Sequence, residues 1–175
     1  MKKWTKGVFT GILTVCTAVV PVCAQENLVD MVPAGEGTTR SYLTGEPVQG
    51  DVRRRPVAVM MGNNKAGAPQ SGISSAGVIY EAPVEGNMTR LMGIFENYEK
   101  IPKIGSVRSC RDYYISYAKE FDAIYAHFGQ AVYALPYLEQ TDNLNGLQLE
   151  GSVYFRTEDR KAPHNAYTSG ERLLN

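Results

Sequence analysis

The chain has 175 residues, of which 43% are hydrophobic, and its 18 basic and 18 acidic side chains give a formal net charge of zero. This is enough chain for one domain with its own hydrophobic core. The balance of charge excludes a general nucleic-acid-binding protein, which needs a basic surface.

The N-terminus has the three regions of a secretory signal peptide. Residues 1–6 carry three lysines, residues 7–20 are apolar and uncharged, and small residues precede Gln25. We therefore expect a signal peptide over residues 1–24 and cleavage after Ala24. The mature protein is then expected to be secreted or to lie on the outer face of the cytoplasmic membrane.

Two alternatives to cleavage would keep the chain at the membrane. One is a lipoprotein acylated on Cys23, although Val20–Val22 before this cysteine is a poor lipobox, the recognition sequence for acylation. The other is a signal peptide that is not cleaved. Contact with a membrane is expected only through such an anchor. Removing the signal leaves 15 basic and 18 acidic residues, a net charge of −3, and leaves Cys110 as the single cysteine, which excludes an intrachain disulfide.

Residues 25–55 contain several prolines and glycines and no sustained hydrophobic period, which predicts a flexible tether. The stretch 42–45 is a candidate for its first ordered piece. The apolar run 56–61 that follows predicts a central strand buried on both faces. Asn63 and Asn64 then lie at the carboxyl end of that strand, where α/β sheets place their ligands.

Two further strands are predicted at residues 78–81 and 88–96, and they read as an antiparallel pair. Glu81 and Glu85 bracket the loop between them. Arg90 falls on an otherwise apolar face of the second strand, so it needs a partner, for which Glu81 or Glu85 could serve.

The stretch 104–129 predicts a loop, a helix and a strand. Ser109 is a plausible N-cap, and apolar residues recur at helical spacing after it. Residues 122–128 alternate as a strand does, with Ile124 and Ala126 on one face and Tyr125 and His127 on the other.

The rest of the chain is less regular. We expect weak helix over residues 130–140, a loop over 141–146, a strand over 151–156 and a polar loop over 159–165. A last helix starts near Ser169, and we expect it to be cut short in this sequence. Together these elements predict an α/β domain over residues 56–175, with a mixed sheet of five or six strands and flanking helices.

The chain resembles the YerB-like family of bacterial envelope proteins, a family whose name records an unknown function. The resemblance runs from about Tyr42 to the C-terminus and rests on Leu43–Gly45, Arg55–Met60, Pro69–Gly72, Ile79–Glu81, Glu85–Gly86, Thr89–Arg90, Ile104–Ser109, Arg111, Ala126–His127 and Arg160–Asn165. It implies a secreted or lipid-anchored protein, usually with a second domain downstream. This sequence departs from the family at the lipobox, at Gly62–Asn64, where an aspartate usually precedes asparagine, and in the absence of that second domain.

Arg108 and Arg111 flank the predicted helix start, where the first backbone N–H groups lack partners and the helix dipole is positive. Two guanidinium groups there suit a phosphate, sulfate or carboxylate. The alternative is that both arginines pair with carboxylates elsewhere in the fold. Cys110 between them is either a nucleophile with a lowered pKa or a small buried residue.

Further polar residues could complete a site around these arginines. The candidate ligand-binding residues are Arg90, Arg108, Arg111, Lys161 and Asn165, and the candidate catalytic residues are His127, His164, Glu81 and Glu85. His127 is alternatively a core histidine bonded to backbone. The same residues could equally form a buried ion network that fixes loops. No metal-binding motif is present, so neither metal nor another cofactor is expected.

Three functions remain open. The first is an envelope domain that binds an anionic cell-wall polymer or glycan phosphate through the arginines. The second is a hydrolase or transferase on such a polymer, with His127 or His164 transferring protons and Glu81 or Glu85 orienting them or acting as acid. The third is a protein–protein adaptor whose polar cluster is structural.

Overall fold

The computed structural model describes residues 37–49 and 54–175. The predicted signal peptide and parts of the predicted tether lie outside these residues. The elements are β1 (Thr38–Arg40), β2 (Pro47–Gln49), β3 (Val57–Gly62), η1 (Ile73–Ser75), β4 (Val78–Val84), β5 (Met88–Phe95), β6 (Ile104–Gly105), α1 (Asp112–Lys119), β7 (Ile124–His127), η2 (Val132–Ala134), α2 (Leu135–Leu138), β8 (Asn143–Asn145), α3 (Gly146–Leu149), β9 (Phe155–Arg156), β10 (Ala166–Thr168) and α4 (Gly170–Leu174).

The domain is built on a mixed five-stranded sheet in the order β4-β5-β3-β7-β8. Strand β3 pairs antiparallel with β5 and parallel with β7, while β4 joins β5 antiparallel and β8 joins β7 parallel. The expectation of a mixed α/β sheet is confirmed, as are the central strand and the antiparallel pair that follows it.

All six residues of β3 are buried because both faces of the sheet are covered. Ala58 and Met60 belong to the core on one face, and Val57, Val59 and Met61 belong to the core on the other. The unbroken apolar run therefore reflects burial on two sides.

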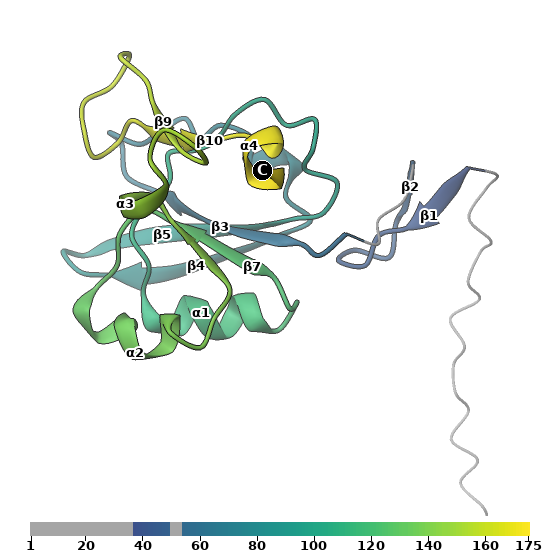
Figure 1. Cartoon of the computed structure of the whole chain (residues 1–175), viewed down its shortest axis with the longest axis horizontal. Helices are drawn as coiled ribbons and strands as arrows, with labels where there is room; N and C mark the ends of the chain where they lie inside the picture. The colour runs from purple at the N-terminus through teal and green to yellow at the C-terminus, as the bar shows by residue number, and fades with distance from the viewer. Residues whose placement is uncertain (1–36, 50–53) are drawn as a thin grey trace, which may run out of the picture. The chain divides into compact units, whose positions relative to one another are not determined.

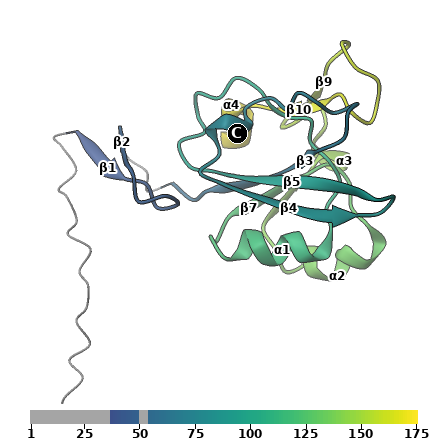
Figure 2. The ribbon, with the colours of Figure 1, turned by 180° about the vertical axis from the view of Figure 1, so that it is seen from behind.

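Helices α1 and α2 lie against one face of the sheet (Figure 1). Tyr114, Ile115 and Ala118 of α1 pack into the core on that side. The other face is covered by the three-stranded sheet β6-β10-β9 and by α4, as the reverse view also shows (Figure 2). Ile104, Tyr154 and Leu173 contribute to this second core.

The predicted helix start at Ser109 is wrong. Helix α1 begins at Asp112, its N-cap is Arg111, and no side chain caps it. The segment before it is extended, since Arg108 N donates to Met60 O at 3.0 Å and Phe128 N donates to Arg108 O at 3.0 Å. These bonds hold the backbone between the ends of β3 and β7, so the N-cap lies two residues later than predicted.

The C-terminal part of the domain holds more structure than its sequence pattern predicts. Strand β8 and helix α3 lie where a loop was expected over residues 141–146 and just after it. The strand expected over residues 151–156 is limited to β9, and β10 follows the polar loop. The predicted last helix is confirmed, because Ser169 Oγ accepts from Arg172 N at 3.3 Å and caps α4.

A two-stranded hairpin of β1 and β2 lies within the stretch predicted as a tether. Between its strands, Ser41 Oγ donates to Glu96 Oε2 at 2.5 Å, and Leu43 packs against the core on the α1 face. The expectation that residues 42–45 are an ordered docked piece is confirmed.

Tyr114 ties helix α1 to the sheet through a hydroxyl placed between β4 and β5. This oxygen accepts from Ala82 N at 2.9 Å and donates to Arg90 O at 2.5 Å. We predict that Tyr114→Phe lowers the free energy of unfolding by about 1–3 kcal/mol, because it leaves buried backbone groups without partners. Urea denaturation measures this loss.

Tyr113→Phe is the matched control, since its hydroxyl donates to Pro83 O at the exposed side of the same hairpin. It should cost less than about 1 kcal/mol, in the range of a solvated hydrogen bond. Equal losses in the two variants would contradict the role assigned to Tyr114.

Candidate functional site

The carboxyl end of β3 meets the start of β5 and the segment before α1. Gly62 pairs with Arg90 in the β3–β5 register, and Met61 forms an isolated bridge with Val107. Topology therefore brings Arg90 and Arg108, which are 18 positions apart, to one edge of the sheet.

Gly62 lies in close contact with two side chains. A Cβ at this position would lie 3.3 Å from Ser106 Oγ and 3.4 Å from Arg108 Cγ. Without that atom, the aliphatic part of Arg108 can lie over the end of β3.

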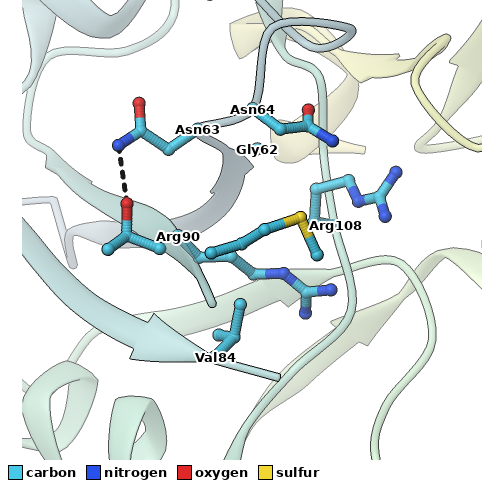
Figure 3. Close-up of a pocket in the computed structure, with 8 residues that line it drawn as sticks. Gly62, Asn63, Asn64, Val84, Arg90 and Arg108 are labelled. Carbon is cyan, nitrogen blue, oxygen red and sulfur yellow. Dashed lines mark hydrogen bonds between the residues drawn. The ribbon is translucent and has the colours of Figure 1, made fainter. Parts of the chain in front are cut away.

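A small cavity of about 20 Å³ opens at this edge, and we call it the arginine cavity. Figure 3 shows Arg90 below Asn63 and Asn64, and Arg108 beside Asn64. The cavity is lined by Gly62, Asn63, Asn64, Val84, Met88, Thr89, Arg90 and Arg108. This volume holds roughly one water-sized group, so a larger ligand could place only one or two atoms inside it.

Arg90 is 8% exposed and donates through Nη1 to the backbone oxygen of Ser109. The expected ion pair with Glu81 or Glu85 is absent from the described residues, since a carbonyl takes its place. Burial, and then the charges of Arg111 and Arg108, lower the pKa of Arg90 to about 10. The side chain is therefore still a cation at neutral pH.

Arg111, by contrast, has a carboxylate partner. Its Nε lies 2.8 Å and 2.9 Å from the two oxygens of Glu85, its Nη2 also bonds to Glu85, and Tyr133 donates to the same carboxylate at 2.6 Å. The hydrogen bonds from Arg111, and then from Tyr133, lower the pKa of Glu85 to about 2. For Arg111 the structure thus supports the pairing alternative.

Arg108 contacts a histidine where a carboxylate would be expected. Its Nη1 donates to Pro163 O at 2.9 Å and lies 3.2 Å from His164 Nδ1. Burial, and then the charges of Arg108 and Arg160, lower the pKa of His164, so its ring is neutral and accepts from Arg108 at neutral pH. Burial followed by the charge of Arg111 lowers the pKa of Arg108 as well.

His127 is fully buried at the end of β7, and both ring nitrogens are engaged. Nδ1 lies 2.8 Å from Gly129 O, and Nε2 lies 3.1 Å from Asn143 Oδ1. The Asn143 amide donates to the carbonyls of Leu138 and Thr141, which fixes its oxygen toward the ring. Burial lowers the pKa of His127, although its two hydrogen bonds act in the opposite direction. Both ring nitrogens face protein oxygens, so neither is available to a substrate.

The remaining predicted residues lie around this edge without joining one cluster. Glu81 accepts from Asn63 at 2.9 Å and from Thr89 at 2.6 Å. Lys161 is exposed in the polar loop. Asn165 is buried, accepts from Arg156 at 2.9 Å and donates to Thr157 O at 3.0 Å, which fixes the base of that loop.

Arg108 also lines a second and larger cavity of about 320 Å³, which we call the Phe128 cavity. Its other lining residues are Val107, Ser109, Phe128, Gly129, Gln130, Leu147, Arg156 and Pro163. Of these, only Arg108 was a candidate site residue in the sequence, because tertiary contacts bring the others together from separate loops and short elements.

Cys110 is fully buried, and burial raises its pKa to about 11. A thiolate is therefore disfavoured, and the prediction of a small buried residue is confirmed. Within residues 37–49 and 54–175, no three His, Cys, Asp or Glu side chains gather as metal ligands would. In the same part of the chain, no helix has the length and apolar character needed to span a bilayer.

The Glu85–Arg111 pair makes stability depend on pH in a defined way. Because the folded pKa of Glu85 is about 2, below its ordinary value of 4.5, the contribution of the pair is full above 4.5 and is lost as the pH falls toward 2. Since Glu85 is more than half exposed, we predict that Glu85→Gln costs only about 1 kcal/mol at pH 7.

Urea denaturation across the acidic range measures this difference, which should shrink steadily below the ordinary pKa of a glutamate. Glu139→Gln, on an exposed residue near the end of α2, controls for the loss of one negative charge and should have almost no effect. A difference that stays constant or grows on acidification would contradict the ion pair.

Comparison with known proteins identifies the relatives of this chain. Residues 43–175 match the family model described as "Protein of unknown function (DUF3048) N-terminal domain". The "Putative lipoprotein YerB" of Bacillus subtilis (strain 168) is 37% identical over 178 residues, which cover 97% of this chain and 50% of that protein. The crystal structure of YerB protein from Bacillus subtilis matches with a TM-score of 0.74 and 38% identity, covering 78% of this chain and 48% of that one.

The chain thus spans about half the length of the relatives it matches. The resemblance to the YerB-like family is confirmed, and the family match over residues 43–175 coincides with the region in which the sequence pattern placed it. The chain belongs to the family of proteins that carry the DUF3048 N-terminal domain, whose function is unknown.

Proposed function

We propose that this domain binds an anionic group of an envelope polymer or glycan in the arginine cavity, and that Arg90 and Arg108 contact the anion. Compared with the sequence-based hypothesis, the proposed site moves from the start of α1 to the end of β3. Arg111 is paired with Glu85 and is not part of the proposed site, and His164 contacts the guanidinium of Arg108.

The observation that carries the proposal is an imbalance of charge. Burial and the charges of Arg111 and Arg108 lower the pKa of Arg90, and burial and the charge of Arg111 lower the pKa of Arg108. Of the nearby carboxylates, Glu85 pairs with Arg111, and Glu81 accepts hydrogen bonds from Asn63 and Thr89. No described acidic side chain lies within 4.0 Å of Arg90 or Arg108. Burying a cation without an anion costs free energy, and a bound anion would recover that cost.

An exported location supports an envelope ligand. The Bacillus subtilis relative is named a putative lipoprotein, and this chain begins with an apolar stretch followed by Cys23. We therefore propose that the domain faces the outside of the cytoplasmic membrane, where anionic wall polymers and glycans are accessible.

The contacts support binding more strongly than catalysis. His127 has both ring nitrogens engaged, Glu81 is bonded to Asn63 and Thr89, and Glu85 is held by Arg111. Of the four candidate catalytic residues, only His164 contacts one of the two arginines proposed to bind the anion, Arg108. A hydrolase or transferase needs an acid or base that reaches the anion, so we do not favour that alternative.

We predict that inorganic phosphate binds the protein and that Arg90→Gln and Arg108→Gln each weaken this binding by about tenfold or more, as expected for the loss of a charged hydrogen-bond donor. Arg90→Lys should retain part of the affinity, because it keeps the charge but loses the planar donor geometry. Binding should also weaken with added salt. Isothermal titration calorimetry provides the readout.

Arg54→Gln is the matched control, since it removes one positive charge before β3, and Arg54 pairs with Glu99 at 3.3 Å. Its phosphate affinity should stay within about twofold of wild type. Amide NMR spectra establish that each variant is folded. If the folded Arg90 and Arg108 variants bind phosphate as wild type does, the arginine cavity is not the anion site.

A further inference from the structure

Arg108 is shared by the two cavities, which differ sharply in size. The arginine cavity holds about 20 Å³, whereas the Phe128 cavity holds about 320 Å³. An anion with one or two atoms in the first cavity leaves the rest of its molecule outside. The second cavity is lined by Pro163, whose backbone oxygen accepts a hydrogen bond from Arg108 Nη1. Its volume falls at the lower end of small-molecule sites, which corresponds to about one ring.

The walls of the Phe128 cavity combine apolar surface with hydrogen-bond donors. Phe128 and Leu147 supply apolar contact, and Leu147 is 65% exposed. Arg108 supplies a guanidinium donor, whereas Arg156 forms an ion pair with Glu150 at 2.7 Å and donates to Asn165 at 2.9 Å. Asn145 Nδ2 donates to Gln130 Oε1 at 3.0 Å, so Gln130 can offer its own Nε2 hydrogens to a ligand.

These walls fit a molecule rich in acceptor oxygens that also has an apolar side. No acidic side chain lines either cavity, which disfavours a cationic ligand. The guanidinium of Arg156 lies over the Phe128 ring, 4.7 Å from its centroid, so that aromatic face is taken and cannot stack on a planar base. A sugar ring, with C–H groups on its faces and hydroxyls at its rim, meets both requirements.

We infer that the ligand is an acidic sugar whose charged substituent binds in the arginine cavity and whose ring occupies the Phe128 cavity, with Arg108 contacting both. This inference rests on the proposed function and specifies its ligand class. The acidic substituent could be a phosphate or a carboxylate, since both present the oxygens that guanidinium groups bind. The ring then adds affinity that a bare anion lacks.

The test compares each acidic sugar with its bare anion by calorimetry: glucose 1-phosphate with inorganic phosphate, and glucuronate with acetate. In wild type, at least one acidic sugar should bind about tenfold more tightly than its bare anion, the gain expected from modest apolar burial and one or two hydrogen bonds. Whichever sugar binds more tightly than its bare anion identifies the acidic substituent as phosphate or carboxylate.

Leu147→Ala removes apolar wall from the Phe128 cavity on an exposed residue, so the fold should tolerate it. It should reduce the advantage of the sugar over its bare anion to less than about threefold, because the ring loses apolar contact, and it should leave the affinity for the bare anion unchanged. Leu135→Ala changes an exposed residue of α2 that lines neither cavity. It is the matched control and should retain the full advantage of the sugar over its bare anion.

The outcomes separate the inference from the proposed function. If bare anions bind through Arg90 and Arg108 but neither sugar binds more tightly, or if Leu147→Ala preserves the advantage, the sugar inference is wrong and the anion site stands. If neither the anions nor the sugars bind, both the inference and the proposed function are wrong.

Discussion

The burial of β3 on both faces is the constraint on which the rest of this domain depends. A strand with six buried residues needs a packed layer on each side, and α1 with α2 forms one while β6, β9, β10 and α4 form the other. The connections between these layers have to pass the ends of the strand. One of them, the segment before α1, crosses the carboxyl end at Gly62 and carries Arg108 with it. The site therefore follows from how the two layers are joined.

The chemistry at that end works against stability. Of the three neighbouring guanidinium groups, only that of Arg111 forms an ion pair among the described residues, and folded proteins seldom leave buried cations without an anion. The Glu85–Arg111 pair relieves part of the repulsion, and the neutral ring of His164 accepts a hydrogen bond from Arg108 without adding charge. What remains is the positive charge of Arg90 and Arg108 at a cavity that Asn63 and Asn64 also line (Figure 3). Sites that bind ligands often retain such an unfavourable arrangement when they are empty.

Strong local patterns made much of the fold predictable. The apolar run of β3, the β4–β5 hairpin and the alternating faces of β7 follow from spacing in the sequence. Strands such as β8, with the sequence NLN, have no such pattern, because their conformation is set by the strand they pair with. The site was harder to predict for the same reason. The sequence marks Arg108 and Arg111 as unusual. Only the fold shows that Glu85 pairs with Arg111, whereas Arg90 and Arg108 have no ion pair among the described residues. Only the fold also shows that Gln130, Leu147 and Arg156 line a cavity together with Arg108.

The most direct test of this account is a crystal structure of the protein soaked in selenate, an anion that anomalous scattering can locate. The account predicts a selenate peak at the arginine cavity, within hydrogen-bond distance of the guanidinium groups of both Arg90 and Arg108. A well-ordered cavity without such a peak, with selenate bound only at exposed arginines such as Arg54, would contradict it.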